Sequence, residues 1–119
     1  MKEEGFKIKN FAVISRLIKT IESKKNYDTS KSYVSKLLNA KDDLLLKKLG
    51  EEAIEVILAA KTGKKKELVS EVADLLFHLL VVLQSFGVEL DDVFEEIQKR
   101  EGVSGIDEKN SRPTINDGN

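Results

Sequence analysis

The stretch Leu75-Leu76-Phe77-His78-Leu79-Leu80-Val81-Val82-Leu83 decides the fold of this 119-residue chain. It lies inside a helical pattern that runs from about Lys65 to Phe86 and ends at Gly87. Because the stretch is apolar almost all round, the helix is predicted to be covered on every side. A small chain cannot supply all of that cover. We therefore expect burial against neighbouring helices and also against a second copy of the chain, in a homodimer.

Apolar residues recur at helical spacing on both sides of this stretch, and no strand pattern competes with them. A helix of about 20 residues should precede it, ended by Gly63 in the position that favours a left-handed backbone. The chain is predicted to be all-α, a four- to five-helix bundle with one domain over residues 1–112 and a flexible tail over 113–119. The predicted helices run over about 10–23, a short segment capped by Ser30 or Ser32, 41 or 42 to 62, 65–86 and 89–100.

Composition excludes several classes of protein. The chain has 20 basic and 21 acidic residues, so its net charge of −1 gives no general attraction to nucleic acid or to an acidic membrane. It has no cysteine, which excludes disulfides and thiolate metal sites. No apolar segment follows Met1, and Leu75 to Leu83 is too short to span a bilayer. We expect a soluble cytoplasmic protein without nucleic-acid or membrane partners.

Five carboxylates stand at helical spacing in two groups: Glu51, Glu52 and Glu55 on one predicted helix, Glu71 and Asp74 on the next. At about 100° of rotation per residue, the first three share one arc and the last two lie about 60° apart. The short turn between the helices predicts an antiparallel hairpin. Folding at that turn places Glu55 opposite roughly Glu71, and Glu52 opposite roughly Asp74.

Carboxylates this close require a compensating positive charge. Oxygen ligands without cysteine favour Mg²⁺, with Mn²⁺ as the alternative, and such ions assist hydrolysis of phosphate esters and phosphoanhydrides. Two other interpretations stay open on spacing alone. The acids can form solvated helix faces paired with lysines, which is common in a chain with 34% charged residues. The apolar helix can also belong to a non-catalytic interaction module.

The residues around the acids carry a resemblance to a known family. The acidic spacing is similar to that of the MazG-like all-α nucleoside triphosphate pyrophosphatases. More closely, the chain resembles the phosphoribosyl-ATP pyrophosphohydrolase family over roughly residues 11 to 112. The motifs that carry this resemblance are Lys47-Lys48-Leu49-Gly50-Glu51-Glu52-Ala53-x-Glu55-Val56, Glu67-Leu68-Val69-x-Glu71-x-Ala73-Asp74-Leu75-Leu76-x-His78-Leu79-Leu80 and the tail Arg100-Glu101-Gly102-Val103-Ser104-Gly105-Ile106.

The resemblance implies a Mg²⁺-dependent hydrolase that converts phosphoribosyl-ATP to phosphoribosyl-AMP and pyrophosphate, the second step of histidine biosynthesis. An alternative is a house-cleaning nucleoside triphosphate pyrophosphatase with the same acids. Glu52, Glu55, Glu71 and Asp74 would ligate the metal. Glu51, at the edge of the same arc, is the candidate for orienting the attacking water.

Six further residues are candidates for contacts with the substrate. Lys48 would meet a phosphate or simply offset the carboxylates. His78 lies one turn beyond the acids, where it would contact substrate or pack in the core. Tyr33 would stack on the base or pack its short helix. Arginine forks match phosphate oxygens, so the ribose phosphate is expected to bind the last three candidates, Arg100, Lys109 and Arg112.

Overall fold

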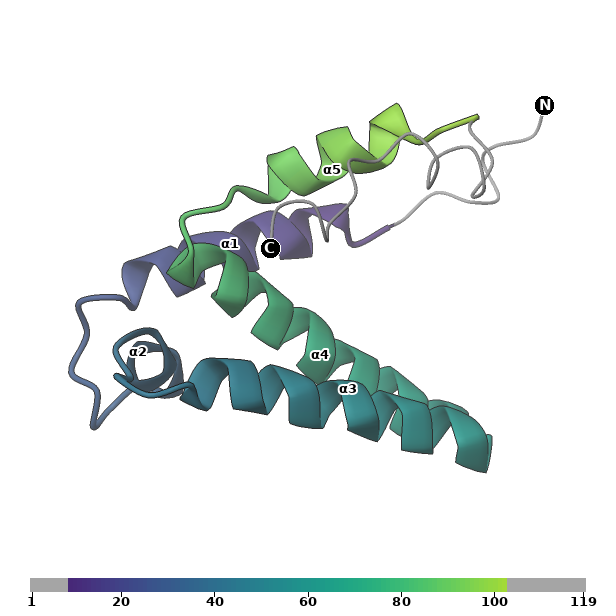
Figure 1. Ribbon diagram of the computed structural model, residues 1–119, viewed down its shortest axis with the longest axis horizontal. Helices are drawn as coiled ribbons and strands as arrows, with labels where there is room; N and C mark the ends of the chain where they lie inside the picture. The colour runs from purple at the N-terminus through teal and green to yellow at the C-terminus, as the bar shows by residue number, and fades with distance from the viewer. Residues whose placement is uncertain (1–8, 103–119) are drawn as a thin grey trace, which may run out of the picture. The chain divides into compact units, whose positions relative to one another are not determined.

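The computed structural model describes residues 9–102, and in that range it contains five helices and no strand (Figure 1). The prediction of an all-α fold is confirmed. Each helix lies within three residues of its predicted bounds. The helices are α1 (Phe11–Ser23), α2 (Tyr33–Leu38), α3 (Leu44–Thr62), α4 (Lys65–Ser85) and α5 (Leu90–Lys99).

The chain divides into two compact units, the first ending at Val88 and the second beginning at Glu89. In the first unit, α4 packs against α1, α2 and α3, and α2 also packs against α3. The apolar helix is therefore the central element of this unit, as its sequence predicts. The described part of the second unit consists of α5 and its flanking residues. A single domain over 1–112 stays a prediction, and the predicted tail at 113–119 lies outside the described residues.

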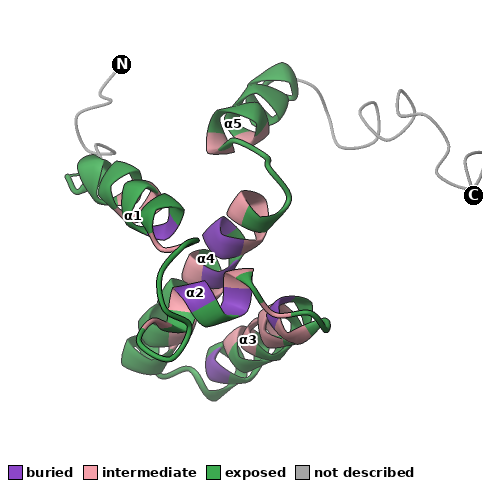
Figure 2. Cartoon of the chain, turned by 90° about the vertical axis from the view of Figure 1, so that its left-hand side faces the viewer, coloured by how far each residue is buried: buried purple, intermediate pink, exposed green. Residues whose placement is uncertain are grey.

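The core of the first unit is small and is centred on the second half of α4. Val81 is completely buried, and Leu80 and His78 are 5% exposed. Figure 2 shows these buried segments of α4 beside α2 and the end of α1. Side chains from each of the other three helices complete this core: Ile21, Leu37, Leu45 and Ala59.

The opposite side of the hairpin formed by α3 and α4 leaves apolar side chains uncovered. Helical spacing puts these residues on one stripe of each helix. We call them the two apolar stripes: Ile54, Ile57 and Leu58 on α3, and Val69, Val72, Leu76 and Leu79 on α4, all exposed. Two residues of the stretch that decides the fold, Leu76 and Leu79, therefore remain uncovered within one chain.

Local polar contacts fix where the helices begin and end. Gly63 has φ 74° and caps α3, and its N–H donates to the carbonyl of Ala60 at 3.2 Å. A side chain is strained in this left-handed conformation, which explains the glycine. The Oγ of Ser32 accepts from the Ser35 N–H at 3.1 Å and caps α2. Ser32, rather than Ser30, is therefore the cap.

The start of α3 differs from its prediction by two to three residues. The Oδ1 atom of Asp42 accepts a hydrogen bond from the backbone N–H of Leu44 at 3.2 Å. Such a side-chain turn competes with helical geometry, so α3 begins at Leu44 instead of at Lys41 or Asp42.

By length and composition alone, α4 as a whole is long and apolar enough to cross a membrane. The prediction that excluded a membrane span considered only residues 75–83, which form less than half of this helix. Two other observations favour a soluble helix. Glu71 and Asp74 would be costly inside a bilayer, and α4 packs against three helices of its own chain. A soluble protein is therefore the interpretation that fits the structure.

Candidate metal centre

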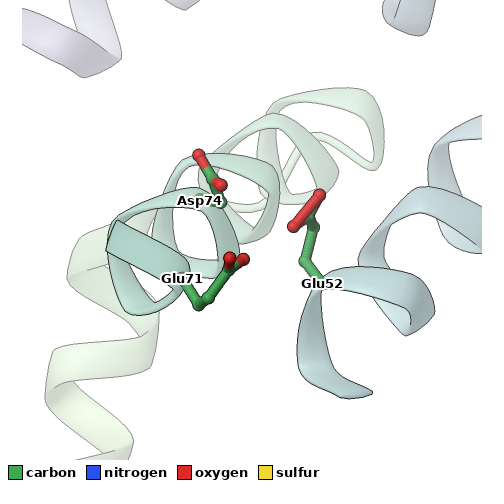
Figure 3. A group of neighbouring side chains, drawn as sticks. All are labelled: Glu52, Glu71 and Asp74. Carbon is green, nitrogen blue, oxygen red and sulfur yellow. The ribbon is translucent and has the colours of Figure 1, made fainter. Parts of the chain in front are cut away.

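Three carboxylates from two helices meet on the hairpin. Glu52 comes from α3, and Glu71 and Asp74 come from α4. One oxygen of each lies within 4.8 Å of the others. Glu52 and Glu71 are half-buried, whereas Asp74 is exposed. Figure 3 shows the three side chains directed toward one another across the space between the helices. We call Glu52, Glu71 and Asp74 the carboxylate group.

The arrangement follows from helical spacing and from the short turn. Glu71 and Asp74 are three residues apart, so they project from the same side of α4. The antiparallel course of α3 brings Glu52 to face both of them (Figure 3). Glu55 lies outside the carboxylate group, although its charge acts on Glu71. Three of the four predicted ligands are thus brought together, and ligation by all four stays a prediction.

The electrostatics of the carboxylate group disfavour three negative charges. Partial burial raises the pKa of Glu71, and the charges of Glu55, Asp74 and Glu52 raise that pKa further. Within residues 9–102, no ion pair joins a lysine or arginine to a carboxylate of this group. A bound cation would supply the missing charge.

The donor set suits a hard divalent cation. All three donors are carboxylate oxygens, the ligands that Mg²⁺ and Mn²⁺ prefer, and no sulfur or imidazole donor belongs to the group. Three protein oxygens leave room for waters and for phosphate oxygens around an ion. The residues present therefore fit a metal that works together with a phosphate substrate.

Lys48 and Glu51 form a pair at the edge of this region on α3. Their Nζ and Oε1 atoms are 3.4 Å apart, and both side chains are partly exposed. The pKa of Lys48 is raised, first by Tyr33 and then by the hydrogen bond and the charge of Glu51. Lys48 therefore lies close to both residues. Its charge offsets Glu51, and the roles predicted for Lys48 and Glu51 toward phosphate and water stay predictions.

Tyr33 and His78, treated separately in the sequence, contact each other. The Tyr33 hydroxyl and His78 Nε2 are 2.9 Å apart, and His78 Nδ1 lies 2.8 Å from the backbone carbonyl of Asp74. The Tyr33 ring also stacks on Phe77, with centroids 6.4 Å apart. The two residues are 45 positions apart, so no spacing in the sequence indicated this contact.

Tyr33 also lies within electrostatic reach of the carboxylate group. Burial raises the pKa of the Tyr33 hydroxyl, the nearby Lys48 charge lowers it, and the carboxylates of Glu52, Asp74 and Glu51 raise it. Tyr33 also lines a surface hollow of about 540 Å³. Its other lining residues are polar or basic: Thr29, Ser30, Lys31, Ser32 and Lys36.

The remaining substrate candidates lie toward the C-terminus. Arg100 follows α5, and its Nε donates to Glu96 Oε2 at 3.1 Å. It belongs to the second unit, which is described separately from the carboxylate group. Lys109 and Arg112 lie outside the described residues. Phosphate binding by these three residues stays a prediction.

The amino-acid sequence of this chain is similar to one family model and to several known proteins. Residues 14–101 match the family model described as phosphoribosyl-ATP pyrophosphohydrolase. The chain is 46% identical over 102 residues to the phosphoribosyl-ATP pyrophosphatase of Dechloromonas aromatica, covering 86% of this chain and 94% of that protein. It is 52% identical over 100 residues to the enzyme of the same name from Erythrobacter litoralis, covering 83% and 95%. The corresponding protein of Nitrosospira multiformis is 50% identical over 100 residues, covering 84% and 83%.

Proposed function

The chain belongs to the phosphoribosyl-ATP pyrophosphohydrolase family, and on this premise we propose that it hydrolyses phosphoribosyl-ATP to phosphoribosyl-AMP and pyrophosphate. This reaction is the second step of histidine biosynthesis. The observation that carries the proposal is the carboxylate group, three acids from two helices with no cationic partner in residues 9–102. Such a site binds a metal and, through it, the charged oxygens of a triphosphate.

Glu52, Glu71 and Asp74 would hold Mg²⁺, with Glu55 as the fourth ligand and Mn²⁺ as the alternative ion. When bound, the ion supplies neutralisation of phosphate charge and an acidified water. Glu51 would orient the attacking water, and the phosphoanhydride bond between the α and β phosphorus atoms would break to release pyrophosphate. The Glu51 side chain is 48% exposed, enough to reach a ligand, and the Lys48 ammonium lies 3.4 Å from its Oε1 atom.

The substrate would be held on both sides of this group. Lys48 offers a point charge to the triphosphate, while Arg100, Lys109 and Arg112 would contact the ribose phosphate. Tyr33 is 48% exposed, so the exposed part of its ring can offer a flat apolar surface on which a base stacks. The enzyme would act in the cytoplasm.

A homodimer would cover the two apolar stripes. Exposed apolar side chains along both helices of the hairpin form the kind of surface that monomeric proteins rarely leave open. We expect sedimentation at micromolar concentration to give twice the 13.4 kDa chain mass. Replacing Ile57 and Val72 by glutamate should lower that mass toward one chain. A wild-type monomer at this concentration would contradict the dimer.

A substrate panel tests the reaction itself. Pyrophosphate release is measured from phosphoribosyl-ATP, from dUTP and from the four common ribonucleoside triphosphates, each with and without Mg²⁺. We expect release from phosphoribosyl-ATP only when Mg²⁺ is present. Faster release from dUTP or the common triphosphates would favour a house-cleaning pyrophosphatase. No release from any of them, with or without Mg²⁺, would favour a non-catalytic interaction module.

A further inference from the structure

The hydrogen bonds of His78 fix which ring nitrogen carries a proton. The backbone carbonyl of Asp74 can only accept a hydrogen bond, so His78 Nδ1, at 2.8 Å, must donate to it. A neutral imidazole has one donor and one acceptor nitrogen. In the neutral form, His78 Nε2 is then the acceptor, and the Tyr33 hydroxyl at 2.9 Å donates to it. These two hydrogen bonds link Tyr33 on α2, through His78, to the backbone of α4.

His78 has no nitrogen left for a ligand in this arrangement. The side chain is only 5% exposed, and both ring nitrogens are engaged by the protein. Tyr33 differs, because 48% of it is exposed. An effect of His78 on a ligand would therefore have to pass through Tyr33.

We propose that His78 is a positioning residue, which as the Nδ1–H tautomer binds the Tyr33 hydroxyl proton and fixes the phenolic oxygen as a hydrogen-bond acceptor beside the carboxylate group. A hydroxyl that donates its one proton to the protein retains only its lone pairs for other partners. Tyr33 then selects O–H or N–H donors. Near a cation site such donors are metal-held waters and the hydroxyl groups of a nucleotide ribose.

Packing of the Tyr33 ring supports a fixed hydroxyl. The ring stacks on Phe77 with an interplanar angle of 18°, and it meets the edge of the His78 ring at 78°. Phe77 and His78 are adjacent on α4, so both the ring and the hydroxyl of Tyr33 are held by the same helix turn. That turn directly follows Asp74. The position of Tyr33 is therefore coupled to the carboxylate group through the backbone of α4.

The tautomer can be measured directly, because His78 is the only histidine in the chain. Its imidazole signals in ¹H–¹⁵N spectra of the full-length protein need no further assignment. We expect a protonated Nδ1 and an unprotonated Nε2 at neutral pH. In Tyr33→Phe, which retains the ring, we expect the same tautomer with a shifted Nε2 signal. A protonated Nε2 in the wild type, or an Nε2 signal unaffected by Tyr33→Phe, would overturn the proposal.

Paired substitutions then separate positioning from simple packing. Gln at position 78 carries a terminal amide near the place of Nε2 and can still accept from Tyr33, whereas Asn reaches only the place of Nδ1. We expect His78→Asn and Tyr33→Phe each to weaken the binding of phosphoribosyl-ATP or of Mg²⁺ roughly fivefold, the scale of one neutral hydrogen bond. His78→Gln should restore most of the loss. Circular dichroism of each variant confirms that the helices remain.

Two measurements distinguish whether the group that donates to Tyr33 is a nucleotide hydroxyl or a metal-held water. A rise in KM for phosphoribosyl-ATP with unchanged kcat indicates a nucleotide hydroxyl, and this arm rests on the proposed function. A weaker Mg²⁺ affinity without any nucleotide indicates a metal-held water. In either case, adding His78→Asn to Tyr33→Phe should cost little more than Tyr33→Phe alone. Full additivity, or no effect of Tyr33→Phe in both arms, would contradict the proposal. The tautomer test does not depend on hydrolysis, so failure of the proposed function is recognised separately.

Discussion

Glu96 on α5 and Glu71 on α4 are the same residue type in similar helices, yet their environments shift the carboxyl pKa in opposite directions. Glu96 Oε1 lies 3.5 Å from the Lys99 ammonium and its Oε2 lies 3.1 Å from Arg100 Nε. The hydrogen bond from Arg100, followed by the charge of Lys99, lowers the pKa of Glu96. Partial burial and three or more neighbouring carboxylates raise the pKa of Glu71. The negative charge of Glu96 is offset by cations three and four residues further along the chain, whereas no ion pair in the described residues offsets that of Glu71.

The contrast teaches that spacing along one helix cannot identify a metal site. Glutamate with a cation three or four residues away is the ordinary solution on a solvated helix face. The carboxylate group differs because its acids approach across two helices and form no ion pair with a lysine or arginine of the described residues. A raised pKa together with this geometry supports the proposal of a functional site.

The largest expected difference between the two glutamates is in hydrolysis. Glu71→Gln should reduce Mg²⁺-dependent pyrophosphate release from phosphoribosyl-ATP by at least about 100-fold, because it removes one of the proposed metal ligands. Glu96→Gln, the matched change on α5, should leave the rate within about twofold of the wild type, as expected for a surface pair. Steady-state kinetics of the two variants provide the measurement. Equal losses in both would remove the distinction.

A smaller effect is expected in metal-linked stability. Mg²⁺ at about 100 times its Kd should stabilise the wild type against urea by about 2.7 kcal/mol, because it binds the folded state only. Glu96→Gln should show the same gain, and Glu71→Gln should show little of it. Urea unfolding with Mg²⁺ and with EDTA provides the comparison. A gain that survives Glu71→Gln would place the ion elsewhere.

The smallest expected effect is an opposite dependence on pH, measured in EDTA. The folded pKa of Glu71 is raised above its ordinary 4.5, so its stabilising contribution is present below 4.5 and is lost as pH rises through the folded value. The folded pKa of Glu96 is lowered, so its contribution is present above 4.5 and is lost as pH falls. Toward neutral pH, the urea midpoint of the wild type should therefore fall relative to that of Glu71→Gln. Toward acid pH, the urea midpoint of the wild type should fall relative to that of Glu96→Gln. Parallel pH profiles for the two variants would contradict the difference.

The features that the sequence predicted are those set by local geometry. Helical spacing placed Glu71 and Asp74 on one side of α4, and the position of Gly63 predicted the antiparallel hairpin that brings Glu52 to them. Both depend on rotations and turns within a few residues. The apolar stretch likewise predicted the central place of α4.

The features that the sequence did not predict depend on packing between distant segments. An angular estimate for ideal helices cannot give the offset between α3 and α4, so it did not predict that Glu52 faces Glu71 as well as Asp74. The contact of Tyr33 with His78 requires α2 to lie against α4, and only the packed structure contains that information. Lys109 and Arg112 lie outside the described residues, so phosphate binding by them stays a prediction.

The turn at Gly63 also affects how the site assembles during folding. The carboxylate group spans only residues 52 to 74, and one turn closes that short segment of chain. Closing a short loop costs little entropy, and contacts between nearby residues form early in helical proteins. The metal ligands should therefore come together as soon as this hairpin forms, before the more distant contacts of α1 and α2. A metal bound at the proposed site would then favour the hairpin during refolding as well as the final fold.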